Sequence, residues 1–509
     1  MLWGHSGSLI LAQPVGMLNK AMKQRLLAVV CLCLVLSASC FAQQDVVSEA
    51  SRLELQGQFK QAASLLTAAL QAQSLPAAER NKLAFELDRL ERIKQDYPLT
   101  KEALFTGLKD SVKNLTAEEY EQWIKEGRFD YRDIDGTRFF MGDSVRNLYM
   151  RYPDLDARRI RPKDTAALDQ ARLESIRAIK QASAAAKSPY VLPKRFHVTM
   201  SVAAEADAAP ASETIRAWIP IPRQYPFQGD INLLTTTPPV KHLDDAQSPI
   251  RSAYFEQPAQ AGKPTLFKVE YEYTAQAVRF DIKPDEVRPS NPDDPALKAF
   301  TREGPHVVFT PELRQLSQQI VGGETNPYLK AKKCFDWIAD NIKYSYSTEY
   351  STIRNISDYC RAKGYGDCGQ EALLFIALCR LNGVPARWQS GWNTFPGYKS
   401  NHDWSEVYLA PYGWMPVDPY MGIWAMRYAN TLKPEQKREV RDFYFGGLDQ
   451  YRMIANSDHS QPLTPPKHTM RSDDVDFQRG ELEYGDKNIY LNKFAYNLTL
   501  KEVKPSRVE

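Results

Sequence analysis

The sequence predicts an α+β protein, because successive stretches of its 509 residues differ in the spacing of their apolar side chains. Residues 43–188 show the spacing of amphipathic helices, residues 189–290 alternate apolar and polar positions as half-buried strands do, and residues 291–450 combine both patterns. Residues 451–509 contain short strand-like segments that we expect to pack on the β-rich module. A chain of this length has room for about three domains.

The first region is expected to be mainly helical. Glu49–Ile93 has the pattern of a helical hairpin, with a break at Ser74-Leu75-Pro76 between its two arms. Thr116 and Glu119 have the spacing of a capping box, in which two side chains satisfy free backbone N–H groups at a helix start. An alanine-rich segment from about residue 164 to residue 187 predicts a further long helix.

The next region changes to a period of two residues. Phe196–Val202, Ile215–Pro220 and Leu266–Tyr273 alternate apolar with polar side chains, which is typical of strands with one buried face. Strand-like segments recur late in the chain around Asp476–Gly480 and Ile489–Leu491. We therefore predict that the C-terminal extension, residues 451–509, completes the β-rich module.

Cys368 is the most informative position, because it lies among glycines at the start of an apolar helix that ends near Asn382-Gly383. A thiol attacks a carbonyl only as the thiolate, and its ordinary pKa is about 8.5. The free N–H groups and the dipole at a helix N-terminus favour an anion. We expect this position to favour the thiolate and then the oxyanion of a tetrahedral intermediate.

Two further residues complete a catalytic pattern with the cysteine. His402 lies in a polar loop that enters a strand-like run, where a neutral imidazole can accept the thiol proton. Asp418 follows the apolar run Trp414–Val417, which Pro419 stops, so the carboxylate should project from a strand end and orient the far ring nitrogen of His402.

Each of these residues also has an ordinary structural interpretation. A single cysteine in an apolar helix is usually a small buried hydrophobe, and a single histidine beside a strand is usually structural. Asp367 and Asp403, which adjoin the cysteine and the histidine, are candidates for tuning the charge of the site, but we interpret them as solvated loop carboxylates. Trp404, Trp414 and Cys379 are expected in the core or in a cleft wall.

The combined pattern resembles the catalytic core of the transglutaminase-like superfamily over about residues 325–425. The matching segments are Tyr365-Gly366-Asp367-Cys368, Asn382-Gly383-Val384-Pro385-Ala386-Arg387, the set His402, Trp404, Glu406 and Val407, and Trp414 with Val417-Asp418-Pro419. The resemblance implies a papain-like fold with Cys368 as nucleophile, His402 as base and Asp418 as orienting residue. The long acid-rich insertions that bind calcium in some animal transglutaminases have no counterpart, so we expect neither a metal nor a cofactor.

Three functions are compatible with this site. A thioester on Cys368 can be resolved by water, as in an amidase or peptidase, or by an amine, as in a cross-linking protein-glutamine acyltransferase. We expect hydrolysis, because the core is compact and water is far more concentrated than any amine outside the cell. The alternative of another class is a non-enzymatic scaffold that binds a peptide or glycan. Tyr365, Trp337 and Tyr344 are candidates for an oxyanion donor or a cleft wall, with core packing as the ordinary interpretation.

The N-terminus predicts export. Lys20, Lys23 and Arg25 precede an apolar run of eleven residues, and a small-residue stretch ends at Ala42. This pattern indicates a signal peptide over residues 1–42 and a periplasmic or secreted bacterial protein, since eleven residues are too few to span a bilayer. Lipidation at Cys40 is the alternative, and it would be the only reason to expect a membrane partner.

The charge and the cysteine content limit the classes of partner and the kinds of site that we expect. Residues 1–42 contain three basic and no acidic residues, so their removal leaves 62 of each and no basic field for nucleic acid. We therefore expect a peptide, protein or amide substrate. Four cysteines remain after cleavage, and Cys334 with Cys360 is the one disulfide we consider. The scattered histidines and the lack of a CxxC pattern make a zinc site improbable.

Overall fold

The computed structural model describes residues 46–71 and 75–504. The chain divides into two compact units, residues 1–87 and residues 88–509. The first unit contains α2 (Phe59–Leu70) and the start of α3 (Ala77–Asp96), so helices stand on both sides of the expected break. The predicted signal peptide lies outside the described residues. Within those residues, no helix combines the length and apolar content needed to cross a bilayer.

The second unit begins with further helices. They are α4 (Lys101–Lys109), α5 (Ala117–Lys125), α6 (Ser144–Arg151) and α7 (Ala166–Ala186), with a small hairpin of β1 (Tyr131–Ile134) and β2 (Thr137–Phe140) between α5 and α6. The cap of α5 is confirmed at its N-cap residue, since Thr116 Oγ1 accepts a hydrogen bond from the N–H of Glu119 at 3.1 Å. The long alanine-rich helix is confirmed as α7, within one or two residues of its expected ends.

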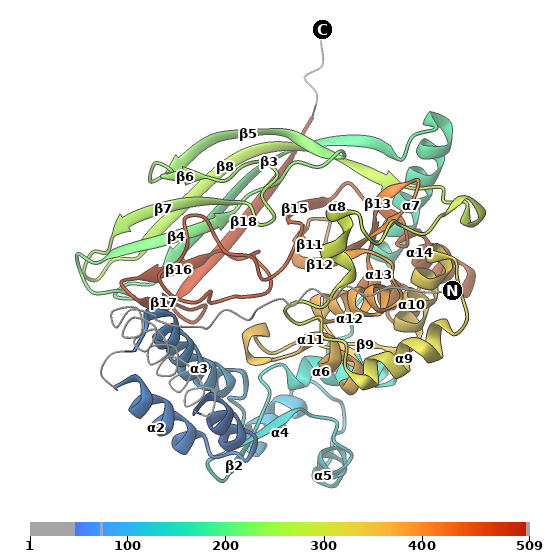
Figure 1. The fold of residues 1–509 in the computed structure, drawn as a ribbon. Coiled ribbons are helices and arrows are strands. Elements are labelled where there is room, and N and C mark those ends of the chain that lie inside the picture. Colours follow the sequence, from blue (N-terminus) through green and yellow to red (C-terminus); the bar gives the residue numbers. More distant parts are fainter. Residues whose placement is uncertain (1–45, 72–74, 505–509) are drawn as a thin grey trace, which may run out of the picture. The chain divides into compact units, whose positions relative to one another are not determined.

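The β-rich module consists of two sheets of five strands each. One contains β3 (Tyr190–Ala204), β5 (Gln228–Thr237), β8 (Thr265–Arg279), β14 (Gly447–Leu448) and β18 (Phe494–Val503), and the other β4 (Thr214–Pro220), β6 (His242–Leu243), β7 (Ser252–Pro258), β16 (Glu481–Tyr484) and β17 (Lys487–Ile489). Buried residues of both sheets, such as Val198, Ala217 and Phe267, form one apolar core. The module is therefore a sandwich, visible at the top of Figure 1.

The late strands join both parts of the second unit. β16 pairs with β4 and β18 pairs with β3, so the C-terminal segment contributes to both sheets of the sandwich. β15 (Arg452–Asn456) instead pairs with a strand of the mixed region, and β14 pairs with β8 of the sandwich. The expected domain boundary at residue 450 thus does not separate the two regions. The strand just before it, β14, belongs to the sandwich, and the strand just after it, β15, belongs to the sheet of the mixed region.

A four-stranded sheet with helices on it forms the mixed region. Its order is β13 (Gly413–Val417), β12 (Ser400–Leu409), β11 (Ala386–Asn393) and β15. The helix α12 (Cys368–Leu381) packs on β11 and β12, and its residues from Gly369 to Arg380 are all buried. A helix enclosed on all sides is apolar around its circumference, which explains the nearly continuous apolar run in the sequence.

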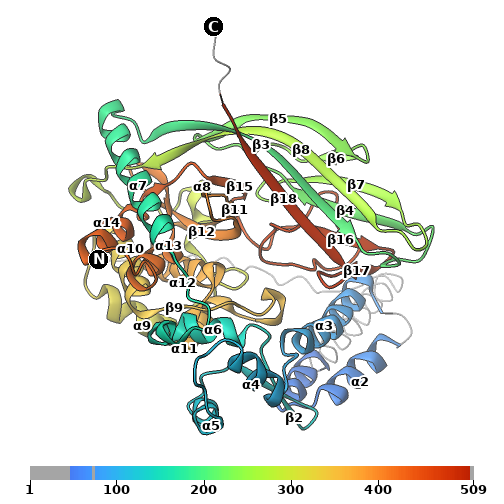
Figure 2. The same ribbon diagram turned by 180° about the vertical axis from the view of Figure 1, so that it is seen from behind.

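Additional helices pack on α12. They are α9 (Pro311–Val321), α10 (Pro327–Asn341), α11 (Ile356–Lys363) and α13 (Pro419–Arg427), while α14 (Pro434–Phe443) packs on α13. Leu173 and Ile176 of α7 share an apolar cluster with Met421 of α13 and Val440 of α14. α7, α13 and α14 accordingly lie side by side in both ribbon views (Figure 1, Figure 2). This packing carries α7 to the helical side of the four-stranded sheet.

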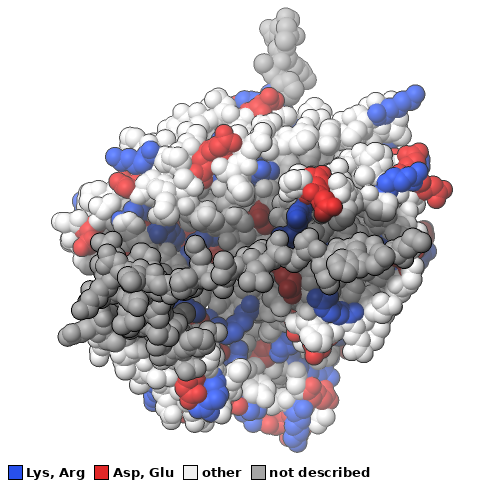
Figure 3. Space-filling view, in the orientation of Figure 1, with Lys and Arg blue, Asp and Glu red and all other residues white. Residues whose placement is uncertain are grey.

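On the face shown in Figure 3, Lys and Arg side chains are interspersed with Asp and Glu side chains. No field of a single charge sign extends across the described part of this face.

Candidate active site

Cys368 occupies the first position of α12, as the sequence predicts. Asp367 is the N-cap residue, and its Oδ1 accepts a hydrogen bond from the N–H of Gln370 at 3.1 Å. The same oxygen accepts the hydroxyl of Tyr350 at 2.7 Å. Gly369 is required by close packing, since a Cβ there would collide with the Tyr350 hydroxyl and lie 2.9 Å from Asp403 Oδ2.

The thiol of Cys368 faces a carboxylate. Its Sγ donates a hydrogen bond to Oδ2 of Asp403 at 3.5 Å. The largely enclosed surroundings raise the pKa of Cys368 well above its ordinary value, and the charges of Asp403 and Asp367 raise it further. In this conformation enclosure and two carboxylates therefore oppose the thiolate that the helix N-terminus is expected to favour.

His402 and Asp418 form the second part of the site. His402 lies inside β12 instead of in a loop, and its Nε2 is 2.8 Å from Oδ2 of Asp418. A carboxylate at Nε2 fixes the proton on that nitrogen, so Nδ1 is left as the acceptor. Burial lowers the pKa of His402 below its ordinary value, and Asp418 compensates only in part. The imidazole is thus neutral near pH 7 and can take up a proton.

Asp418 is held from two further directions. It is the N-cap of α13, so the proline expected to stop a strand is also the first residue of a helix, where the missing N–H of proline costs nothing. Arg452 Nη1 donates to the same Oδ2 atom at 2.9 Å. Burial raises the pKa of Asp418, but its interactions with His402 and Arg452 outweigh burial and leave this pKa below its ordinary value.

Arg452 is a site residue that sequence reasoning missed. It is fully buried at the start of β15, pairs with Asp449 as well as Asp418, and lies over the ring of Trp404. Its position 34 residues beyond Asp418 leaves no local pattern that would indicate the contact.

The structure therefore joins two of the three expected residues directly. His402 and Asp418 are hydrogen-bonded to each other. Cys368 is hydrogen-bonded to Asp403, which is the residue after His402 on the same strand. Gln478 fixes this part of β12, because its Nε2 donates to the backbone oxygen of His402 at 2.9 Å and also to Asp403 Oδ1.

Asp367 and Asp403 are not solvated loop residues. Asp403 is 3% exposed and lies within β12, where Ser390 is its partner on β11. Burial raises the pKa of Asp403 well above its ordinary value, and Asp367 raises it further. Burial likewise raises the pKa of Asp367 to about 6, although the Tyr350 hydroxyl opposes this. The polar sequence around His402 predicts a loop because pairing with a distant strand has no local signature.

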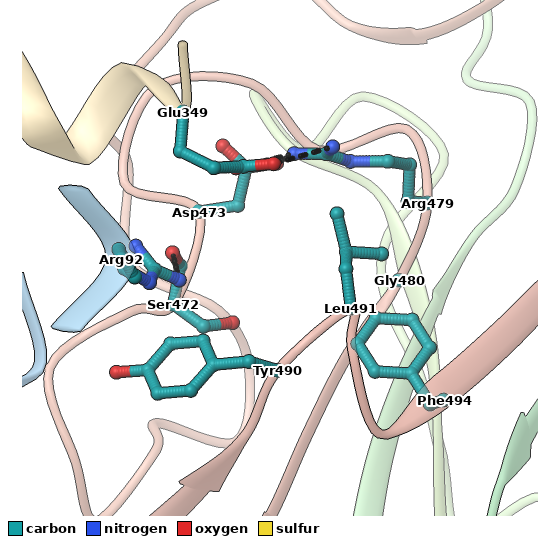
Figure 4. Close-up of a pocket in the computed structure, with 9 residues that line it drawn as sticks. All are labelled: Arg92, Glu349, Ser472, Asp473, Arg479, Gly480, Tyr490, Leu491 and Phe494. Carbon is teal, nitrogen blue, oxygen red and sulfur yellow. Dashed lines mark hydrogen bonds and ion pairs between the residues drawn. The ribbon is translucent and has the colours of Figure 1, made fainter. Parts of the chain in front are cut away.

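A charged cluster adjoins these carboxylates. Arg479 pairs with Glu349 and Asp473 at the edge of a small cavity, and Figure 4 shows the pair with Glu349. Arg92 and Tyr490 line the same cavity, with the guanidinium 4.0 Å from the centre of the tyrosine ring. The positive charge of Arg479 lowers the pKa of Asp403, against the larger effect of burial.

The three residues considered as oxyanion donors or cleft walls, Tyr365, Trp337 and Tyr344, differ in their contacts. The Tyr365 hydroxyl donates to Asp130 at 2.6 Å, and Trp337 packs against the core cluster, so both have structural roles. Tyr344 lies with its ring 5.0 Å from that of Tyr420, which in turn is 5.3 Å from the His402 ring. Tyr344 is thus in the wall that surrounds the site, while the first N–H groups of α12 remain the donors nearest Cys368.

All four described cysteines are free thiols, which contradicts the Cys334–Cys360 pairing. Cys334 instead interacts with Cys379 in the core, as expected for Cys379. Trp404 is fully buried, while Trp414 is partly exposed. In residues 46–71 and 75–504, no group of His, Cys, Asp and Glu side chains has an arrangement that could hold a metal ion.

The model of the family described as the Transglutaminase-like superfamily matches residues 314–419. An uncharacterized protein of Haemophilus influenzae is 24% identical over 178 residues, covering 30% of this chain and 48% of that protein. The uncharacterized protein YebA of Bacillus subtilis is 28% identical over 131 residues, covering 22% of this chain and 18% of that protein. The chain thus spans about half, or less, of the length of these curated relatives.

Two solved structures are also similar. A Cytophaga hutchinsonii protein provisionally described as a cysteine protease is 17% identical with a TM-score of 0.41, over 62% of this chain and 93% of that one. The periplasmic domain of TgpA from Pseudomonas aeruginosa is 15% identical with a TM-score of 0.25, over 51% of this chain and 95% of that one.

Proposed function

Because residues 314–419 form a domain of the transglutaminase-like superfamily, we propose that this protein is a cysteine hydrolase of amide or peptide bonds, with Cys368 as nucleophile, His402 as base and Asp418 as orienting residue. Its substrate is a peptide, a protein or a smaller amide. The observation that carries the proposal is the 2.8 Å contact of His402 Nε2 with Asp418, which leaves Nδ1 to receive a proton beside the helix that begins at Cys368.

The reaction begins with a change at the cysteine. Sγ rests against Asp403, so the proposed reaction requires it to turn toward Nδ1 of His402. His402 takes the thiol proton as Sγ attacks the carbonyl carbon, so proton removal accompanies attack and no stable thiolate is needed. Asp418 and Arg452 hold the imidazole in place while its charge develops.

The tetrahedral intermediate then collapses. Its oxyanion is stabilised by the first backbone N–H groups of α12, beginning with that of Cys368. The carbon–nitrogen bond breaks, the leaving amine takes the proton from His402, and the acyl group stays on Sγ as a thioester. Water attacks the thioester, His402 takes a proton from it, and the carboxylic acid leaves as the thiol is restored.

The same thioester would give a cross-linked product if an amine replaced water. Hydrolysis is preferred because water greatly exceeds any amine in concentration. The test is mass-spectrometric profiling of peptide and amide substrates with and without an added primary amine. An acyl product in which water has replaced the leaving amine or ammonia supports hydrolysis, and one in which the added amine has replaced that leaving group supports transfer. Cys368→Ala should abolish turnover, and wild-type rates for that variant would end the enzyme proposal.

A binding module without catalysis is the second candidate, and one observation favours it: the raised pKa of Cys368 beside Asp403 is typical of an unreactive thiol. The rate of Cys368 alkylation by iodoacetamide separates the two candidates. A catalytic thiol should react more slowly when His402 is changed to Ala, whereas an inert thiol should react at the same slow rate in both proteins.

Export completes the proposal. The signal peptide at residues 1–42 would place the enzyme in the periplasm or outside the cell, where peptide and protein substrates are available. N-terminal sequencing of the protein recovered from the periplasm tests this. A first residue of Gln43 supports cleavage after Ala42, a lipid-modified Cys40 supports membrane anchoring, and an intact N-terminus in the cytoplasm would exclude export.

A further inference from the structure

Arg172, on α7, is a buried cation with no carboxylate partner. The residue is 3% exposed, and no ion pair of Arg172 is found among residues 46–71 and 75–504. Nη1 lies 3.2 Å from the sulfur of Met421, which is a weak acceptor, and Nε has no hydrogen-bond partner. Burying an arginine in this state is costly, because an isolated charge loses its water without gaining a counter-ion.

Aromatic rings compensate for only part of this cost. The guanidinium carbon lies 5.1 Å from the ring of Phe395, 5.0 Å from Tyr398 and 4.8 Å from Trp424. Such contacts attract a cation, but each contributes only about 1–2 kcal/mol, and a ring face accepts no strong hydrogen bond from Nε–H. Tyr398 and Trp424 are partly exposed, so Arg172 lies just beneath the surface.

The nearest acid along the same helix does not serve as the counter-ion. Asp169 is one turn before Arg172 and is also buried, but its Oδ2 accepts hydrogen bonds from Thr165 and Thr431 at 3.1 and 2.7 Å. It thus fixes the start of α7 to the segment after α13 and leaves the guanidinium free.

Arg172 adjoins the proposed active site along two routes. Met421, which contacts the guanidinium, donates its backbone N–H to Asp418 Oδ1 at 3.1 Å. On the other side, Tyr398 interacts through its hydroxyl with Tyr420, whose ring is 5.3 Å from the ring of His402. The charge of Arg172 also lowers the pKa of His402, which agrees with this proximity.

We propose that Arg172 binds a carboxylate of the substrate, so that the enzyme selects peptides or amides with a free carboxylate near the bond that is attacked. This inference rests on the proposed function, because it concerns the same site. A carboxylate is the chemical match for a guanidinium with a free Nε–H, since the planar fork of arginine can bind both carboxylate oxygens. Two sources fit this chemistry: the C-terminus of a peptide and an acidic side chain.

Three randomised tetrapeptide libraries separate these sources: one with free C-termini and no acidic residue, one with amidated C-termini and no acidic residue, and one with amidated C-termini and a single glutamate. The readout is the protection of Cys368 from iodoacetamide in the full-length protein. We expect a carboxylate-bearing library to protect wild-type protein at a concentration about tenfold lower than the neutral library, since a charge-assisted hydrogen bond contributes about that factor.

Substitutions test whether Arg172 is the cause. Arg172→Met should remove the preference while protection by the neutral library stays the same, and Arg172→Lys should retain part of it, because lysine keeps the charge but loses the fork. Arg177→Met is the matched control, since Arg177 lies on the same helix but pairs with Glu439 on the surface. Equal protection of wild-type protein by all three libraries, or a preference that survives in Arg172→Met, would overturn the proposal.

The preference in wild-type protein stays decisive if Arg172→Met does not fold, as its melting temperature would show. Cleavage of the libraries, followed by mass spectrometry, is scored separately. A carboxylate preference without cleavage would support the binding site at Arg172 and refute the proposed hydrolase. Cleavage without a preference would support the hydrolase and refute the binding site.

Discussion

The Sγ atom of Cys368 donates a hydrogen bond to Asp403 Oδ2 at 3.5 Å, although the imidazole expected to receive its proton belongs to the preceding residue. In this arrangement the thiol contacts Asp403, while His402 is hydrogen-bonded to Asp418. Asp403 is the residue that most directly opposes ionisation of the thiol, after the enclosure of the site itself.

Asp403→Asn should activate the thiol. Replacing a carboxylate that raises the pKa of Cys368 by a neutral amide lowers this pKa, and the amide can donate a hydrogen bond to the thiolate. We expect alkylation by iodoacetamide at pH 7 to be severalfold faster, because a lower pKa increases the fraction of the thiol that is ionised. Asp110→Asn, at an exposed helix end, is the control and should react as wild type. Slower alkylation of Asp403→Asn would contradict the assignment.

The acid limb of kcat/KM should lie below pH 6.5. Burial lowers the pKa of His402 from 6.5, and a base with a lowered pKa stays neutral to a lower pH. Arg452 also lowers this pKa, so Arg452→Gln should move the limb to higher pH, whereas Arg452→Lys keeps the charge and the limb. Arg138→Gln, in an exposed ion pair, should have no effect. The pH profile of substrate turnover provides the measurement, and a limb that stays in place in Arg452→Gln would refute the coupling.

Gly369→Ala should disturb the site more than the fold. The added Cβ would collide with the Tyr350 hydroxyl and crowd Asp403, so one of them must move away from the start of α12. We expect turnover to fall about a hundredfold, in line with the effect of a misplaced catalytic group of about 1 Å. Gly323→Ala is the matched control, because nothing lies within 4 Å of its Cβ position. Equal activity of the two variants would show that the packing at Gly369 is not needed.

Glu481→Gln should destabilise the C-terminal part of the sandwich. Burial raises the pKa of Glu481, but Arg471 and Lys467 outweigh it and lower this pKa to about 2. The neutral amide leaves both buried cations without a carboxylate, although Arg471 keeps its hydrogen bonds to the carbonyls of Gln461 and Asp476. We expect a cost of about 3 kcal/mol in the free energy of unfolding. Glu502→Gln, in a half-exposed pair with Lys194, should change it by less than about 1 kcal/mol.

The same carboxylate gives a pH dependence with a definite sign. Its pKa is lower in the folded than in the unfolded protein, so its stabilisation is complete above pH 4.5 and is lost as the pH falls toward about 2. Urea unfolding at several pH values measures this. Glu481→Gln should lose less stability than wild type over that range, and a parallel loss in both proteins would exclude the effect.

The sequence predicted those features of the fold and site that have a local signature. Glycines followed by an apolar run are enough to place Cys368 at the start of a buried helix, and alternation is enough to indicate the strands of the sandwich. The contact of His402 with Asp418 could be predicted from the sequence because each residue adjoins a strand-like run.

Other features depend on contacts between distant segments. Asp403 looks like a loop residue until β12 pairs with β11 and encloses it. Arg452 and Arg172 are far in the sequence from the residues that they contact, Asp418 and Met421. Neither arginine lies in a recognisable motif. Tertiary packing determines which distant charged residues form ion pairs and which do not. The local sequence around each residue contains no information about this packing.

The pairing of β15 with β11 limits how this protein can be divided. The family match stops at residue 419, yet the outer strand of the same sheet and the guanidinium that neutralises Asp418 come from residues 452–456. A fragment cut at the end of the match would expose an unpaired strand edge and leave an acidic group without its counter-charge. Chimeras with relatives should therefore exchange the two segments together.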